Sequence, residues 1–178
     1  RDREPRRNPL WPTKHKAGRG LCYVKKEPTE EKEGFALQFE TYNGGSWAAA
    51  KRQLLRSTAH LVLLQETKLK GEAIDEASSW ALANGWKIVF EEAGQGAKGR
   101  PSAGCAIAIR ERFVMLQPPG RDFRTVAQHR LMGALVEFPG VSFVCHSGYW
   151  RASEGMSERN FELTAALGEH TQAPGKSF

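Results

Sequence analysis

From Gly34 onward, the apolar positions alternate between the spacing of strands and the spacing of helices. Alternation over residues 35–39 predicts a strand that ends near 42–43. Gly44-Gly45 interrupts this pattern, and Ser46 can cap the helix that follows. Residues 60–64 are then apolar without a break, as in a strand that is covered on both faces. The order strand, helix, strand predicts a β-α-β unit with two parallel strands.

The rest of the chain continues this alternation and then changes to strands in succession. Helices are predicted over residues 72–82 and 157–170, and strands over 86–90, 105–109, 131–138 and 141–145. Pro139-Gly140 fits a type II turn between the last two strands. This order favours an α/β domain with mixed sheets and with helices on the outside.

Composition and charge divide the chain into two parts. Of the 178 residues, 40% are hydrophobic and 26% are charged, which allows a core and excludes disorder of the whole chain. No run reaches the ~18 apolar residues that a membrane span needs. The net charge of +6 favours polyanionic partners. Residues 1–33 hold ten Lys and Arg against six Asp and Glu. We therefore expect a basic, disordered tail at 1–33, either a solvated arm or one that binds nucleic acid, and a domain at 34–178.

The three cysteines indicate a reducing environment. The number of cysteines is odd, and Cys22, Cys105 and Cys145 lie far apart in the sequence. No C-x-x-C pair occurs. Cys105 and Cys145 lie inside apolar runs, which favours buried free thiols over a disulfide or a zinc site. The expected location is intracellular, with the nucleus as a candidate.

Two polar residues close the two strands of the predicted β-α-β unit. Asn43 ends the first strand, and Glu66 follows the apolar run of the second. The carboxyl ends of neighbouring parallel strands lie side by side, and ligands of open α/β folds gather there. A carboxylate in this place suits a hard metal ion. The alternative is an ordinary carboxylate at the rim of the sheet.

Several segments resemble one known superfamily, in order along the chain. Residues 63–69 (LLQETKL) resemble the LQET-K motif of the endonuclease/exonuclease/phosphatase superfamily, which includes exonuclease III-like repair nucleases and endonucleases of non-LTR retrotransposons. Residues 41–45 (TYNGG) resemble its WN motif, and 103–107 (AGCAI) are similar to its GGVAI strand. Residues 148–149 (GY) fall where the superfamily carries its active-site tyrosine, and 159–161 (RNF) resemble the helix that follows.

The resemblance implies a fold and a chemistry. The fold would be a four-layer α/β sandwich, in which helices flank two mixed β-sheets. The chemistry would be Mg²⁺- or Mn²⁺-dependent cleavage of a phosphate ester. Glu66 would hold the metal, Asn43 would contact the metal or orient the phosphate, and Tyr149 would hydrogen-bond a phosphate oxygen. The partner would be nucleic acid, and the leading expectation for the reaction is DNA nicking of retroelement or repair type. The alternatives are a phosphatase acting on phospholipid or inositol phosphate, and a non-catalytic nucleic-acid-binding remnant.

Two later motifs of the superfamily have no match in this chain. These are the D-x-N motif and the S-D-H motif, which carry the group that activates water and further metal and phosphate contacts. Trp150-Arg151 also follows Tyr149 where the superfamily usually has a proline. Removing members of a catalytic unit costs most of its activity. We therefore expect a C-terminally incomplete fold, a piece of a longer protein, that is inactive as it stands.

Other residues are candidates for substrate contact. Trp47 and Trp150 follow the two site motifs, and Lys68 lies within the LQET-K motif. Lys98 and Arg100 lie in or next to a G-x-G-x-x-G stretch, which a strand rather than a helix follows, so no cofactor nucleotide is expected.

The remaining aromatic and histidine residues are assigned to structure. Trp80 and Trp86 fall in helix and strand patterns and are expected in the core. His129 and His146 have no placed acid or nucleophile in the sequence, which favours structural roles.

Overall fold

The computed structural model describes residues 18–22, 36–96, 99–116, 128–150, 155 and 157–172. Its elements are, in order, β1 (Gly18–Cys22), β2 (Leu37–Asn43), α1 (Trp47–Arg56), β3 (Leu61–Gln65), α2 (Glu72–Ala83), β4 (Trp86–Glu91), β5 (Gly94–Gln95), β6 (Pro101–Ser102), β7 (Cys105–Arg110), β8 (Val114–Leu116), β9 (Leu131–Phe138), β10 (Val141–Gly148) and α3 (Glu158–Gln172). Within these ranges no helix is long and apolar enough to cross a membrane.

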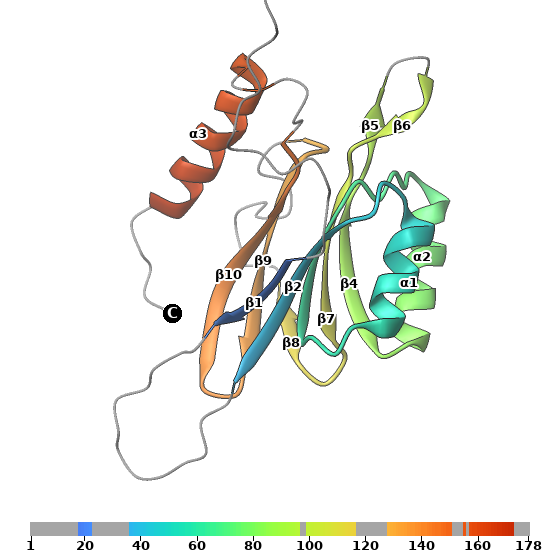
Figure 1. The fold of residues 1–178 in the computed structure, drawn as a ribbon, viewed down its shortest axis with the longest axis vertical. Helices are drawn as coiled ribbons and strands as arrows, with labels where there is room; N and C mark the ends of the chain where they lie inside the picture. The colour runs from blue at the N-terminus through green and yellow to red at the C-terminus, as the bar shows by residue number, and fades with distance from the viewer. Residues whose placement is uncertain are drawn as a thin grey trace, which may run out of the picture.

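The strands form two larger sheets that pack face to face (Figure 1). The first has the order β1-β2-β3-β7-β4, in which β2 and β3 run parallel and the other neighbours run antiparallel. The second has the order β10-β9-β8 and is antiparallel throughout. The expected α/β fold is confirmed. In the described part of the second sheet, the Pro139-Gly140 turn joins β9 directly to β10 as a hairpin, so these two strands run antiparallel.

Helices α1 and α2 cover the outer face of the first sheet (Figure 1). Helix α3 follows β10 in the chain and accepts, through Thr164 Oγ1, a hydrogen bond from Trp150 just after that strand. Helix α1 starts where the sequence predicts, since the Ser46 side chain accepts a hydrogen bond from the Ala49 N–H at 3.3 Å. Its Ala50 and Leu54 pack on the sheet together with Ala77 and Ala81 of α2. The small side chains let both helices approach the strands closely.

Strands β3 and β7 are buried on both faces, because each separates two hydrophobic cores. Side chains on one face, such as Leu61 and Ile107, pack against the second sheet. Side chains on the other face, such as Leu64 and Ala106, pack against the helices. The continuous apolar run at 60–64 predicted this arrangement, and the burial of β3 confirms it.

The N-terminal segment contributes one strand to the first sheet. β1, which lies within the stretch expected to be a tail, pairs antiparallel with β2 from Gly18↔Thr41 to Cys22↔Leu37. The other residues of 1–33 lie outside the described residues. The boundary at 33–34 therefore stays a prediction.

Cys105 and Cys145 are free, buried thiols, as expected. Both lie in the core between the two sheets. Burial raises the pKa of the Cys105 thiol to about 12; the Glu91 carboxylate adds to this rise, and a hydrogen bond from Ser147 opposes it. Burial likewise raises the pKa of Cys145 to about 12. Both side chains are therefore neutral at physiological pH.

These two thiols predict a loss of stability at alkaline pH. A thiol in the unfolded chain has a pKa of about 8.5. Its folded pKa is higher, so the stabilisation is complete below pH ~8.5 and falls as the pH rises towards 12. Each thiol should remove about 1.4 kcal/mol of unfolding free energy per pH unit in this window.

Urea unfolding at several pH values tests this prediction. The Cys105→Ala variant should lose stability less steeply than the wild-type chain above pH ~8.5. Comparing the two chains cancels the titration of lysines and tyrosines. Equal slopes for both would contradict a neutral buried thiol at Cys105.

Candidate functional site

Asn43 and Glu66 lie together at the carboxyl ends of β2 and β3. Asn43 pairs in register with Gln65, the residue before Glu66. The Asn43 Oδ1 atom accepts a hydrogen bond from the Gly45 N–H at 3.2 Å. A Cβ placed on Gly45 would lie 3.6 Å from Glu66 Oε2. Gly45 therefore lies next to both the Asn43 and the Glu66 side chains. The β-α-β geometry therefore brings the two predicted residues to one place.

The backbone after β3 has an uncommon conformation. Glu66 and Lys68 have φ angles of 56° and 57°, in the left-handed region that non-glycine residues seldom adopt. The Thr67 N–H donates to the Gly104 carbonyl at 3.0 Å, and the Lys68 N–H donates to the Ala103 carbonyl at 3.1 Å. These bonds to the loop before β7 hold the turn. Such strain costs of order 1 kcal/mol per residue and is concentrated at functional sites.

A lysine lies beside the Glu66 carboxylate. The distance from Lys68 Nζ to Glu66 Oε2 is 3.7 Å, and the two side chains are 41% and 20% exposed. The carboxylate is thus accessible from solvent and has a mobile counter-charge. A cation can approach the Glu66 carboxylate, and a phosphate the Lys68 ammonium, without the cost of opening a buried ion pair.

Strand β10 reaches the same edge through Ser147. The Ser147 hydroxyl donates to the Leu64 carbonyl at 2.9 Å, and Gln65 Nε2 donates to Ser147 Oγ at 3.4 Å. Tyr149 follows two residues later and is half-buried against the core between the sheets. Its N–H donates to the Arg130 carbonyl at 2.8 Å. Tyr149 therefore lies just beyond the end of β10, the strand whose Ser147 contacts the end of β3.

The other predicted contact residues are placed differently. Trp47 packs edge-on against Trp80 and Phe90, with ring centroids 5.6 and 5.3 Å apart, so its ring contributes to the core under the helices. Trp150 Nε1 donates to Thr164 Oγ1 of α3 at 3.4 Å. Arg100 is exposed beside the β5–β6 hairpin.

A role of Trp47, Trp150 and Arg100 in substrate binding stays a prediction. Lys98 lies outside the described residues. The interpretation of Trp80 and Trp86 as core residues is confirmed, since both belong to the core under the helices.

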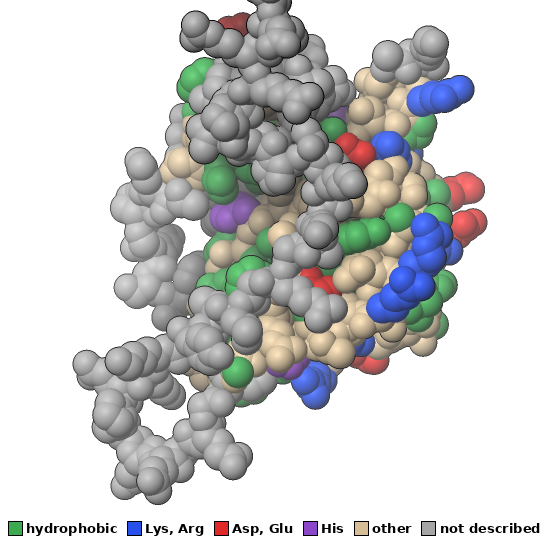
Figure 2. Space-filling model, viewed as in Figure 1, with side chains coloured by type: hydrophobic (Ala, Val, Ile, Leu, Met, Phe, Trp, Pro, Cys, Tyr) green, Lys and Arg blue, Asp and Glu red, His purple; other side chains and the backbone are tan. Residues whose placement is uncertain are grey.

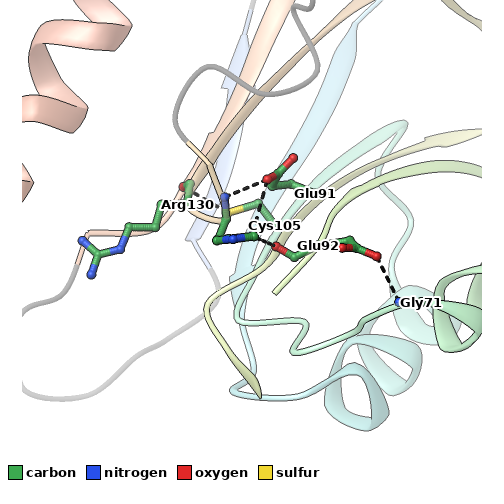
Figure 3. A network of polar contacts seen from close by, with 6 residues as sticks. Gly71, Glu91, Glu92, Cys105 and Arg130 are labelled. Atoms are coloured by element: carbon green, nitrogen blue, oxygen red, sulfur yellow. Dashed lines mark hydrogen bonds and ion pairs between the residues drawn. The ribbon is translucent and has the colours of Figure 1, made fainter. Parts of the chain in front are cut away.

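A second group of polar residues at this edge was not found from the sequence. It consists of Glu91, Glu92 and His129, and His129 contacts both glutamates. Glu91 and Glu92 lie near Cys105, where β4 ends and β7 begins (Figure 3). The Glu91 carboxylate accepts the His129 backbone N–H at 2.7 Å, and the Glu92 carboxylate accepts the Gly71 N–H before α2 at 3.0 Å. These pairs join residues 21 to 38 positions apart, and no local motif marks them.

The residues at the edge fit a divalent ion only in part. Among the described residues, no group of three or more His, Cys, Asp or Glu side chains could hold a metal ion. Mg²⁺, however, is commonly bound by one or two carboxylates, with water and substrate phosphates completing its ligands. The accessible Glu66 carboxylate, with the Asn43 amide beside it, fits that kind of site.

Comparisons with known proteins give three partial structural matches. No protein-family model matches the chain, and no curated protein matches it. The chain does match an AP endonuclease from Leishmania major (TM-score 0.44, 17% identity, 77% of this chain and 45% of that one). It matches the endonuclease domain of TRAS1, a telomere-specific non-LTR retrotransposon (0.41, 12%, 75% and 53%). It also matches the 3′ phosphatase NExo from Neisseria, solved with a product DNA hairpin (0.48, 21%, 76% and 51%).

These three are members of the endonuclease/exonuclease/phosphatase superfamily. It is the superfamily that the sequence motifs resemble. The chain spans about half the length of the solved proteins it matches. Because each TM-score lies below 0.5, the likeness assigns no activity to this chain.

Proposed function

We propose that the chain carries the metal- and phosphate-binding part of a divalent-metal-dependent phosphodiesterase that acts on nucleic acid, with DNA nicking of retroelement or repair type as its reaction. One observation carries the proposal. Asn43 and Glu66, the residues on which the superfamily motifs centre, converge around Gly45 at the ends of two parallel strands. The left-handed backbone at Glu66 supports the proposal, because strained residues are concentrated at functional sites.

Each residue has a distinct part in this proposal. Glu66 would hold Mg²⁺ or Mn²⁺, and Asn43 would be a further ligand or orient the phosphate. Tyr149 would donate a hydrogen bond to a phosphate oxygen. The bound ion would neutralise charge on the phosphate and lower the pKa of a bound water. Lys68 would contact a phosphate oxygen, because its ammonium is exposed and lies beside the Glu66 carboxylate.

The distribution of charge supports a polyanionic substrate. Figure 2 shows Lys and Arg side chains over α1 and towards the tip of the β5–β6 hairpin. Helix α1 carries Lys51, Arg52 and Arg56 and no acidic residue. The whole chain has a net charge of +6. Such a surface attracts the phosphate backbone without reading sequence.

Mn²⁺ binding in the presence of DNA tests the site. In a titration of the isotope-labelled chain with a DNA oligonucleotide and Mn²⁺, the amide signals of Asn43, Gly45 and Glu66 should broaden first, because the paramagnetic ion would lie beside them. The signal of Glu111, at the opposite end of β7, should broaden last. Broadening that is uniform along the chain, or absent, would contradict the proposed site.

Turnover by this chain is expected to be very slow. The D-x-N and S-D-H motifs have no match in the sequence, and loss of cooperating catalytic groups typically lowers kcat by several orders of magnitude. Plasmid nicking at ordinary rates in Mg²⁺ would show that other residues replace them. Salt-sensitive DNA binding that needs no divalent ion and survives Glu66→Ala, without Mn²⁺ broadening at the site, would identify a non-catalytic binding remnant instead.

A further inference from the structure

We propose that His129 forms a second phosphate-binding subsite, which contacts the nucleic-acid strand at a phosphate near the one that Asn43 and Glu66 would bind. The inference rests on the proposed function for its ligand, a nucleic-acid strand. It does not depend on catalysis or on a metal ion. The proposal is based on the contacts of the imidazole ring, on the backbone that holds it and on its position at the edge of the first sheet.

The imidazole of His129 is held by fixed acceptors on one side. Its Nδ1 lies 2.9 Å from the Glu92 carbonyl oxygen and 3.8 Å from Glu91 Oε1. Since a carbonyl can only accept, Nδ1 carries the proton in this contact. No hydrogen bond from Nε2 is recorded to any described residue. When the ring is protonated, Nε2–H is therefore a donor that a phosphate oxygen can use.

The surroundings of His129 are shaped to hold this ring. A Cβ on Gly94 would lie 2.8 Å from the ring's Cδ2, so only glycine leaves the space that the imidazole occupies. His129 has a φ of 68°, a left-handed conformation, and its carbonyl accepts the Gly104 N–H at 2.9 Å. A strained residue that is supported from several sides is typical of a functional site.

In the Glu91–His129 pair, the carboxylate is buried and the imidazole ring faces outward. The Glu91 side chain is 8% exposed, whereas the His129 side chain is 33% exposed. The Glu91 carboxylate thus lies behind the ring and away from solvent, and the ring is the part of the pair that solvent reaches. The other titratable groups here are Glu92, whose carboxylate is bonded to the Gly71 N–H, and the neutral Cys105 thiol. The Arg130 side chain extends away from the cluster (Figure 3).

The position of His129 fits a strand that also passes Glu66. Gln65, Cys105 and Glu91 are register partners across β3, β7 and β4. Two strand spacings, about 10 Å, therefore separate the Glu66 end of β3 from the Glu91 end of β4. The Gly104 carbonyl accepts the Thr67 N–H, and the Gly104 N–H donates to the His129 carbonyl. The short loop before β7 therefore connects the turn at Glu66 with His129. A nucleic-acid backbone along this edge would meet both.

The test measures DNA binding in EDTA, which separates this subsite from the metal site. Affinity of the chain for a single-stranded oligonucleotide is measured at pH 5.5 and pH 8, and at about 50 and 200 mM salt. The His129→Asn variant removes the imidazole but tolerates a left-handed backbone. At pH 5.5 the slope of log affinity against log salt should be smaller by about 0.7 for this variant, which corresponds to one phosphate contact. The loss of affinity between the two salt concentrations should then be about threefold smaller than for the wild-type chain.

Three further variants make the result specific. His129→Arg carries a permanent charge, so its affinity at pH 8 should approach that of the wild-type chain at pH 5.5. Gly94→Ala displaces the ring and should behave like His129→Asn. His60→Asn, at the opposite end of β3, should keep the wild-type difference between the two pH values. A His129→Asn variant with the wild-type salt slope and pH dependence would overturn the proposal, even if Mn²⁺ binds at Glu66 as expected.

Discussion

Replacing Glu66 with glutamine should abolish the site-specific broadening by Mn²⁺ and lower the affinity for the ion by at least about 100-fold. The estimate follows from the effect of residues that only support a ligand, whose loss already costs 10- to 100-fold. Glutamine keeps the size of the side chain and removes its negative charge. The neighbouring Asn43 amide is neutral, so it would not replace that charge.

The matched control for this prediction is Glu111→Gln. Glu111 is exposed, lies directly after β7 and is far from the site along that strand. Its replacement changes the net charge by the same amount and should leave Mn²⁺ broadening at Asn43 and Gly45 unchanged. If both variants lowered Mn²⁺ binding equally, the ion would be responding to overall charge, and Glu66 would not be its ligand.

Replacing Trp86 with alanine should produce the largest loss of stability, about 3–5 kcal/mol. Trp86 is 1% exposed and opens β4. The Arg110 guanidinium lies 3.9 Å from the centroid of its ring and also donates to the carbonyls of Ser57 and Ala59 after α1. Removing the indole therefore leaves a cavity and frees the arginine that ties the end of α1 to the sheet.

Urea unfolding of three variants separates these contributions. Trp86→Phe keeps an aromatic face for Arg110 and should cost clearly less than Trp86→Ala. Trp80→Ala, on the half-buried face of α2, should also cost less. A loss below about 1 kcal/mol for Trp86→Ala would mean that the core closes around the missing ring, contrary to this account.

Helices and strands could be predicted from the sequence where the pattern that marks them is local. The alternation at 35–39, the Ser46 cap and the unbroken run at 60–64 lie within single elements, and each corresponds to an element of the structure. Asn43 and Glu66 could be brought together for the same reason, since one short β-α-β unit places both.

Contacts between distant segments could not be predicted in this way. Strand β1 has no strong alternation of its own and exists by pairing with β2. Glu91 and His129 meet across 38 residues because β7 places the loop before β9 next to the end of β4. The sequence offered no acid for His129, and only the assembled sheet supplies one.

The position of β7 has a consequence for how the domain is assembled. β3 and β4 are separated in the sheet by β7, which comes later in the chain than both. Until residues 105–110 pair with them, β3 and β4 are not joined in one sheet, because β7 lies between them. Because such long-range pairings are slow to form, insertion of this central strand is the step at which the first sheet becomes a single cooperative unit.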